Sequence, residues 1–256
     1  MRELITFPCE GDTLVGTLDE AEGTTGLLIV SGGNELRCGA HRSMALLGAG
    51  LAAAGIPVFR FDRRGIGDSE GANHGYTDSS PDIAAAARAF RTLQPQLKRL
   101  LGFGNCDAAT ALALFHRDAA IDALVLANPW VGDEGDGMPP ASAIRSHYAG
   151  RLKDPRQWLR ALSGGINISK ALKGLRKASA KPREPANPIA ARMLVAMVDT
   201  PRTILLAEGD NTARRFDEAW TEVEGIVRRD TDSHSFARPG DHEWLRERLR
   251  EAVSSI

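Results

Sequence analysis

The stretch LGFGNCDAATALALF, residues 101–115, joins a short apolar run to a segment rich in alanine and leucine. We expect a buried strand over Leu100–Gly104 and a helix over Asp107–His116, because the apolar residues of the second segment recur at helical spacing. Cys106 lies at the corner between them. The residues two positions before and after it are glycine and alanine, and such small residues let a strand and a helix approach closely. The sequence therefore predicts a tight strand-to-helix turn with a cysteine at its tip.

Short apolar runs of the same kind recur along the chain, each followed by a small-residue loop and a helical pattern. Runs that are apolar on both faces are typical of buried parallel strands, and helices between them would cover both faces of the sheet. The runs are Gly26–Val30, Pro57–Phe61, Leu100–Gly104, Ala123–Ala127 and Thr203–Leu206, after a hairpin of Leu4–Phe7 and Leu14–Leu18. The helical patterns are Gly39–Ala54, Ser80–Leu93, Asp107–His116, Ala213–Val227 and Asp241–Val253. The predicted fold class is α/β, with a mostly parallel central sheet and helices on both faces.

The segment 132–187 interrupts this alternation. It has no strong strand pattern, and its ends, rich in proline and glycine, enclose helical material such as RLKDPRQWLRAL. We expect a helical cap inserted into a core of residues 1–131 and 188–256. Asp154 is the one acidic residue between Arg151 and Arg183. The expected cap is therefore basic, and it is either a solvated helical face or a surface that attracts an anionic substrate or carrier.

The composition excludes several classes of partner. The 256 residues are 43% hydrophobic, which suits one domain with an insertion, and 32 basic against 33 acidic residues leave a net charge of -1. That balance provides no global field to hold nucleic acid or an anionic membrane. The first residues are too acidic for a secretion signal, and the apolar runs are shorter than the roughly 20 residues of a membrane helix. We expect a cytoplasmic protein without stable membrane insertion; its oligomeric state stays unknown.

The three cysteines are odd in number and share no metal-ligand spacing, so we expect neither a disulfide framework nor a metal site. They are Cys9, Cys38 and Cys106. Around Cys106, GNCDA has the spacing of a nucleophile elbow, with cysteine in place of serine and alanine in place of the last glycine. A thiol at a helix N-terminus is favoured as thiolate. The alternative is a packed cysteine in a tight turn. We predict that Cys106 is a nucleophile.

Such a nucleophile needs a base and a group that orients the base. His242 follows the last strand-like stretch and fits the chain order of nucleophile, acid and histidine; His234 is its nearest rival. Asp210, in the exit loop of the strand that starts at Thr203, is the predicted acid. The rival acids are Glu208 and Asp133. We therefore predict a triad of Cys106, His242 and Asp210.

A glycine-rich loop, SGGN at residues 31–34, follows the first predicted parallel strand. We expect the backbone N–H of Asn34, or that of Gly33, and the N–H of Asp107 to bind the negative oxygen that forms when a carbonyl is attacked. The loop lacks the G-x-G-x-x-G spacing of a dinucleotide site. Three nearby basic side chains are either structural or bind a carboxylate or phosphate of the substrate. They are Arg37, His41 and Arg42.

One further motif completes a family pattern. FDRRGIGDS at residues 61–69 resembles the D-x-R-G-x-G-x-S segment of α/β-hydrolases, and with the elbow, Asp210 and His242 the resemblance spans most of the chain. Within that superfamily, SGGNELRCGAHR, GNCDAATAL, EGDNTARRF and GDHEW resemble the first of the two exosortase A-associated hydrolases, which also carry cysteine in the elbow. The resemblance implies an intracellular acyl hydrolase with an α/β-hydrolase fold.

The function predicted from these residues is hydrolysis of an ester or thioester through an acyl-enzyme on Cys106, without metal or cofactor. The expected substrate is a small-molecule or carrier-linked acyl compound. An acyltransferase and a lactonase similar to dienelactone hydrolase, which also uses an elbow cysteine, are the enzymatic alternatives. A ligand-binding protein on the same fold is the alternative outside the enzymes.

Overall fold

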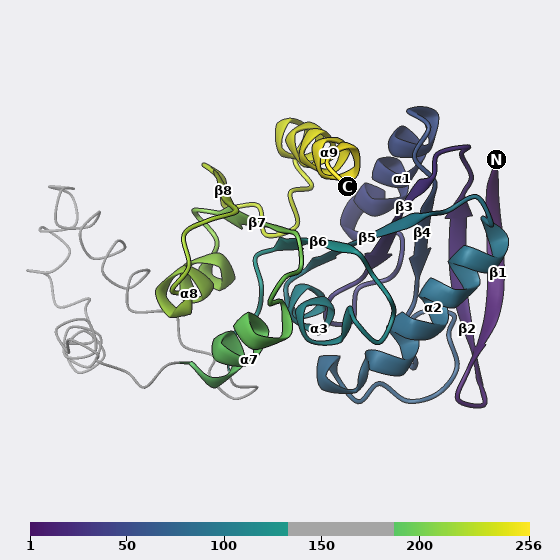
Figure 1. Ribbon diagram of the computed structural model, residues 1–256, viewed down its shortest axis with the longest axis horizontal. Helices are drawn as coiled ribbons and strands as arrows, with labels where there is room; N and C mark the ends of the chain where they lie inside the picture. Colours follow the sequence, from purple (N-terminus) through teal and green to yellow (C-terminus); the bar gives the residue numbers. More distant parts are fainter. Residues whose placement is uncertain (133–186) are drawn as a thin grey trace, which may run out of the picture. The chain divides into compact units, whose positions relative to one another are not determined.

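The computed structural model describes residues 1–132 and 187–256, drawn as ribbon in Figure 1. The segments 1–131 and 188–256 form one compact unit. The predicted cap, apart from its two end residues, lies outside the described residues. Within the described ranges, none of the helices combines the length and the apolar character that crossing a bilayer requires.

The described unit is built on an eight-stranded sheet with the order β1-β2-β4-β3-β5-β6-β7-β8. The strands are β1 Arg2–Cys9, β2 Asp12–Asp19, β3 Thr25–Val30, β4 Val58–Phe61, β5 Arg99–Asn105, β6 Ala123–Ala127, β7 Arg202–Ala207 and β8 Ile226–Arg229. β1 pairs with β2, and β2 with β4, in antiparallel fashion, and all other neighbours are parallel. The carboxyl ends of β3 to β8 therefore meet at one edge, where open α/β sheets bind their ligands.

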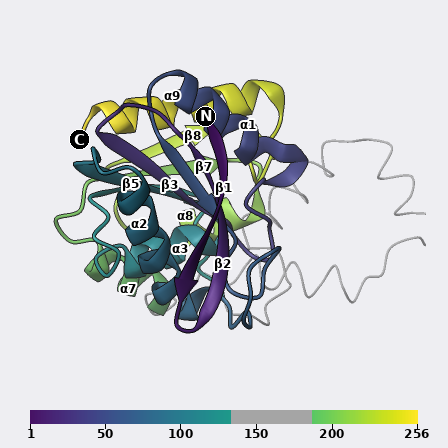
Figure 2. The ribbon, with the colours of Figure 1, turned by 90° about the vertical axis from the view of Figure 1, so that its right-hand side faces the viewer.

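Helices cover both faces of the sheet, as the sequence predicts. They are α1 Ser43–Ala53, α2 Ser80–Leu93, α3 Asp107–Phe115, α7 Pro188–Ala196, α8 Asn211–Ala219 and α9 Pro239–Ser254, with short 3-10 turns at Ala40–Arg42 and Tyr76–Asp78. In Figure 1, α1 and α9 lie above the sheet and the other four below it, and Figure 2 shows the same layers end-on. Each face has its own apolar core, with Leu47 and Leu245 on the α1 side and Phe90 and Leu112 on the other.

The strands and helices lie close to their predicted bounds, with two differences. The helix predicted over Gly39–Ala54 begins only at Ser43, because Gly39, His41 and Arg42 have positive φ angles that cannot belong to a right-handed helix. The helix predicted over Ala213–Val227 ends at Ala219, and the edge strand β8 follows it. Here Gly225, at φ 75°, turns the chain in a conformation that glycine adopts without strain. The strand β8 is therefore a correction to the predicted helix.

Candidate active site

The elbow at Cys106 has the backbone geometry of a strained turn. Cys106 has φ 59° and ψ −127°, a region that residues with a Cβ rarely adopt. Its N–H donates to the carbonyl of Ala127 at 3.0 Å, and its carbonyl accepts the N–H of Ala109 at 3.2 Å. A Cβ at Gly104 would lie 2.8 Å from the carbonyl carbon of Ala108, so glycine is required there. The predicted tight turn is present, and Cys106 at its tip is half-buried.

A histidine and an aspartate meet this elbow. His234 lies in the loop between β8 and α9, and its Nδ1 is 3.1 Å from Oδ1 of Asp210. The same imidazole forms a side-chain hydrogen bond with Cys106. Asp210 caps α8, where its Oδ2 accepts the N–H of Ala213 at 2.9 Å. Three loops at one edge of the sheet therefore bring a thiol, an imidazole and a carboxyl group into one chain of hydrogen bonds.

The pKa values of this group follow from those contacts. Hydrogen bonds to Asp210 and then to Cys106 raise the pKa of His234 to about 10, against the effect of burial. Burial acts to raise the pKa of Asp210, but hydrogen bonds from His234 and from the N–H of Ala213 outweigh it and hold that pKa below its usual range. At neutral pH His234 is therefore an imidazolium ion between a carboxylate and the sulfur of Cys106.

The structure corrects the predicted position of His242. Its Nε2 lies 3.0 Å from the carbonyl oxygen of Ser43, on the α1 side, and its backbone N–H bonds to Arg238 in the first turn of α9. The chain order of nucleophile, acid and histidine places the histidine after the last strand. That strand is β8, which was not predicted from the sequence, and it ends at Arg229, so the expected position of the histidine lies earlier in the chain than His242. The loop after β8 carries His234, the rival weighed from the sequence.

Of the two rival acids, the structure describes Glu208, and no interaction between its carboxylate and His234 is present. Glu208 is exposed, and its carbonyl oxygen accepts from Nε of Arg214 at 2.8 Å. Asp133 lies outside the described residues. Among the residues that the structure describes, no group of three or more histidine, cysteine, aspartate or glutamate side chains is arranged to hold a metal ion.

The loop after β3 lies directly against the elbow. A Cβ at Gly32 would lie 2.5 Å from the carbonyl of Asn105 and 3.5 Å from Cβ of Cys106. The N–H of Gly33 donates to Oδ1 of Asp107 at 2.6 Å, so it is occupied here. The backbone N–H groups of Asn34 and Asp107 have no acceptor among the described residues. Of the predicted oxyanion donors, these two are the ones left free.

A comparison with models of known protein families assigns this chain to one family. The model of the family described as "Serine aminopeptidase, S33" matches residues 25–213, which include the loop after β3, the elbow and Asp210. The chain belongs to this family of α/β-hydrolases. A search of curated proteins finds no match. The protein is thus a hydrolase with the α/β-hydrolase fold, and the residue at the tip of its strand-to-helix turn is Cys106.

Solved structures agree on the fold. The Pyrococcus furiosus esterase Pf2001 superposes with a TM-score of 0.64 and 17% identity, over 100% of this chain and 92% of its own. The α/β-hydrolase GrgF from Penicillium sp. sh18 gives 0.65 and 17%, over 100% and 98%. The Xanthomonas campestris protein XC6422, an α/β serine hydrolase without lid, gives 0.58 and 16%, over 99% and 94%. At these identities the likeness establishes the α/β-hydrolase fold.

The first of the two arginines in FDRRGIGDS, Arg63, supports the loop after β3, although it stands at the variable position of the D-x-R-G pattern. Arg63 is 3% exposed, and its Nη2 donates to the carbonyl oxygen of Gly33 at 2.7 Å. The same nitrogen lies 3.6 Å from Oδ2 of Asp107, and Nη1 donates to Oγ of Ser79 at 3.0 Å. The motif was singled out from the sequence as a family resemblance, but its role in holding the loop after β3 was missed.

The three basic residues predicted near the substrate divide into two kinds. The guanidinium of Arg37 bonds to Asp62 and Asp68, and its Nε donates to Oγ1 of Thr17 at 3.1 Å. These bonds favour the structural alternative for Arg37. His41 and Arg42 are exposed and have φ angles of 53° and 63°. Substrate binding by these two residues stays a prediction.

Replacing Arg37 with glutamine is expected to lower the free energy of unfolding by about 3 kcal/mol, because it leaves the fully buried carboxylate of Asp62 without its ionic partner. For a chain of this size the melting temperature would fall by roughly 6–12 °C. The matched control, Arg42→Gln, removes the same charge from an exposed side chain and is expected to change stability by less than about 0.5 kcal/mol. Equal melting temperatures for the two variants would contradict this assignment.

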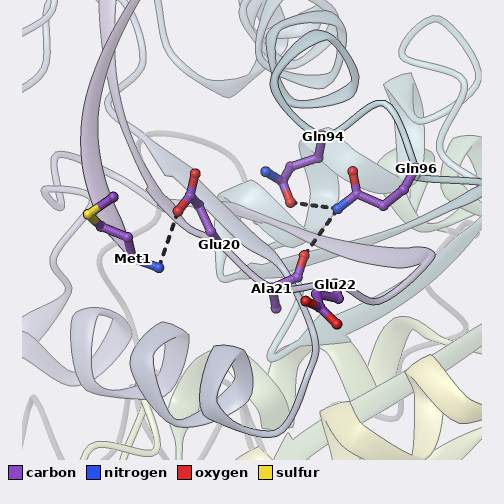
Figure 3. A pocket seen from close by; sticks show the side chains of 6 residues that line it. All are labelled: Met1, Glu20, Ala21, Glu22, Gln94 and Gln96. Atoms are coloured by element: carbon purple, nitrogen blue, oxygen red, sulfur yellow. Dashed lines mark hydrogen bonds and ion pairs between the residues drawn. The ribbon is translucent and has the colours of Figure 1, made fainter.

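A separate hollow lies at the opposite edge of the sheet, and Figure 3 shows its lining. Its volume is about 550 Å³. The lining residues are Met1, Glu20, Ala21, Glu22, Gln94 and Gln96. Met1 precedes β1 and Glu20 follows β2, whereas the other four precede β3 or β5. Nε2 of Gln96 donates to Oε1 of Gln94 and to the carbonyl of Ala21. This lining contains no cysteine, serine or histidine.

Proposed function

We propose that this hydrolase cleaves an ester or thioester through an acyl-enzyme on Cys106, with His234 moving the proton and Asp210 orienting it. The observation that carries the proposal is the imidazole of His234, which contacts Asp210 through Nδ1 and also forms a hydrogen bond with Cys106. A nucleophile, a proton carrier and an orienting carboxylate in one hydrogen-bonded line are the parts that acyl transfer requires.

In the first step the sulfur of Cys106, in its deprotonated form, attacks the carbonyl carbon and forms a carbon–sulfur bond. The electron pair of the carbonyl moves to its oxygen, where the free N–H groups of Asn34 and Asp107 are available to stabilise the charge. When this intermediate collapses, the bond to the leaving alcohol or thiol breaks. The leaving group takes its proton from the imidazolium of His234, which the raised pKa keeps protonated at neutral pH.

In the second step the acyl group on Cys106 changes the properties of His234. A thioester sulfur carries no negative charge, so the contribution of Cys106 to the raised pKa of His234 is lost. The neutral imidazole can then accept a proton from water as a general base. The oxygen of that water attacks the thioester, the carbon–sulfur bond breaks, the sulfur of Cys106 leaves with the electron pair, and His234 keeps the proton taken from the water. The Asp210 carboxylate stabilises the imidazolium in both steps.

The decisive experiment traps the acyl-enzyme. On mixing with p-nitrophenyl acetate we expect a burst of p-nitrophenol of about one equivalent per chain, followed by slower turnover. Mass spectrometry of the quenched protein should locate one acetyl group on the peptide that contains Cys106. Prior alkylation of Cys106 with iodoacetamide should remove both the burst and the turnover.

The other two cysteines supply the controls. Burial and the neighbouring Asp82 raise the pKa of Cys9 to about 11, so it stays a thiol at neutral pH and should not react. Cys38 is half-buried, and the variant Cys38→Ala removes it as a competing target. Turnover that persists in this variant after Cys106 is fully alkylated would rule out the proposed nucleophile. Acetylated amine formed when an amine is added would show acyl transfer instead of hydrolysis.

A further inference from the structure

The residue directly after β6 stands out in the described part of the chain. Asn128 is 0% exposed and has φ 42°, a left-handed conformation that costs energy for any residue other than glycine. Asparagine tolerates it better than most residues. Because strained residues persist where the surrounding structure uses them, the contacts of this side chain show what it is used for.

Those contacts join the strand ends that carry the active site. Nδ2 of Asn128 donates to the backbone carbonyl of His234 at 2.7 Å. Its Oδ1 accepts the N–H of Ala207, the last residue of β7, at 2.9 Å. The carbonyl of that alanine in turn accepts the N–H of Asp210 at 2.9 Å. In Figure 1, β6 lies between β5, which leads into the elbow, and β7.

We propose that Asn128 is the positioning residue of the active-site histidine: it fixes the backbone of His234 so that the imidazole reaches both Asp210 and Cys106. This role rests on the proposed function, and Asn128 itself touches no reacting atom. The loop after β8 needs such a link, because His234 is partly exposed and the strand that precedes it, β8, has a neighbouring strand on one side only. When the side-chain amide of Asn105 is oriented so that its oxygen and nitrogen both find partners, its nitrogen also donates to the backbone carbonyl of His234, at 3.1 Å.

Two variants of Asn128 separate positioning from folding. Asn128→Gly keeps the positive φ without strain and removes every side-chain hydrogen bond of this residue, including the bond of Nδ2 to Oδ1 of Asn105 at 3.3 Å that forms in the other orientation of the Asn105 amide. Asn128→Asp keeps the acceptor for the N–H of Ala207 but replaces the donor to His234 with an oxygen. The control is Thr200→Val, which removes one side-chain hydrogen bond of 2.9 Å, to the buried His116, away from the active site. All variants are made in the Cys38→Ala background.

The readouts are kcat and KM with p-nitrophenyl acetate, the melting temperature, and the rate of iodoacetamide alkylation of Cys106 against pH. In Asn128→Gly we expect kcat to fall up to about 10²-fold with KM within about twofold, since substrate contacts are unchanged. The alkylation profile should move to higher pH, because the imidazolium no longer stays beside the sulfur. Asn128→Asp should show the same shift. Thr200→Val should lower the melting temperature and leave the profile unchanged.

The outcomes are distinct. A folded Asn128→Gly variant with the wild-type alkylation profile would overturn the proposal, even if kcat fell, because a purely structural role would give that result. Failure of both variants to fold would also count against it, since Asn128 would then serve the fold. If the unmodified protein forms no acyl-enzyme but the profile still shifts in Asn128→Gly, the proposed function fails and the positioning role stands.

Discussion

Replacing Cys106 with alanine is expected to lower p-nitrophenyl acetate turnover by about 10³-fold or more, because its sulfur is the atom that we propose to carry the acyl group. The melting temperature should change little, since the side chain is half-buried and small. Cys106→Ser is expected to fall between the two proteins, because a hydroxyl fits the same elbow but is a weaker nucleophile than a thiolate.

The matched control for this prediction is Cys38→Ala, which makes the same change in a half-buried cysteine of the loop after β3. We expect its turnover to stay within about twofold of the wild type, in line with substitutions that remove no reacting group. A Cys106→Ala protein that still releases p-nitrophenol at the wild-type rate would contradict the assignment of the nucleophile. Loss of turnover in both variants would point to a disturbed structure around the site rather than to loss of the nucleophile.

Replacing His234 with glutamine is expected to lower turnover by about 10²- to 10⁴-fold, the usual contribution of a general acid or base. His242→Gln is expected to stay within about threefold of the wild type, because that imidazole contacts the carbonyl of Ser43 and not the elbow. Initial rates of the two variants at neutral pH, with melting temperatures as a check on folding, decide between the histidines. The opposite ranking would restore His242 and remove His234 from the site.

The acylation rate of the wild-type protein should depend on pH through the protonation of His234. With a pKa of about 10, the imidazolium of His234 is the acid for the leaving group below that pH and is lost above it. The acylation rate is therefore expected to fall as the pH rises through about 10, and this fall should be absent in His234→Gln. The raised pKa also means that the ion pair stabilises the fold below the unfolded pKa of about 6.5. This contribution declines as the pH rises toward 10.

Much of the fold, and two of the three residues of the candidate site, could be predicted from the sequence. The elbow is a local feature: a strand, a cysteine and a helix within fifteen residues, with small residues where the backbones meet, so its spacing alone reveals it. Asp210 follows a strand whose apolar run is unmistakable. Both depend on patterns that buried parallel strands impose on their own residues.

The rest depended on contacts that local patterns do not encode. The strand β8, Ile226–Arg229, lies at the edge of the sheet and is only partly buried, so its charged residues continue the preceding helical pattern instead of breaking it. Gly225 followed by two β-branched residues was the available signal. Missing this strand moved the expected histidine from position 234 to 242. The pairing of Arg37 with Asp62 joins the loops that follow the neighbouring strands β3 and β4, so predicting it also required the sheet order.

The edge strand β8 is paired on one side only, and the loop that follows it contains His234. Marginal elements of this kind open locally at a lower free energy than the centre of a protein. On warming, this loop is therefore expected to open and activity to be lost below the melting temperature of the whole protein. The half-life of the activity would then depend on the edge of the sheet rather than on the well-packed core.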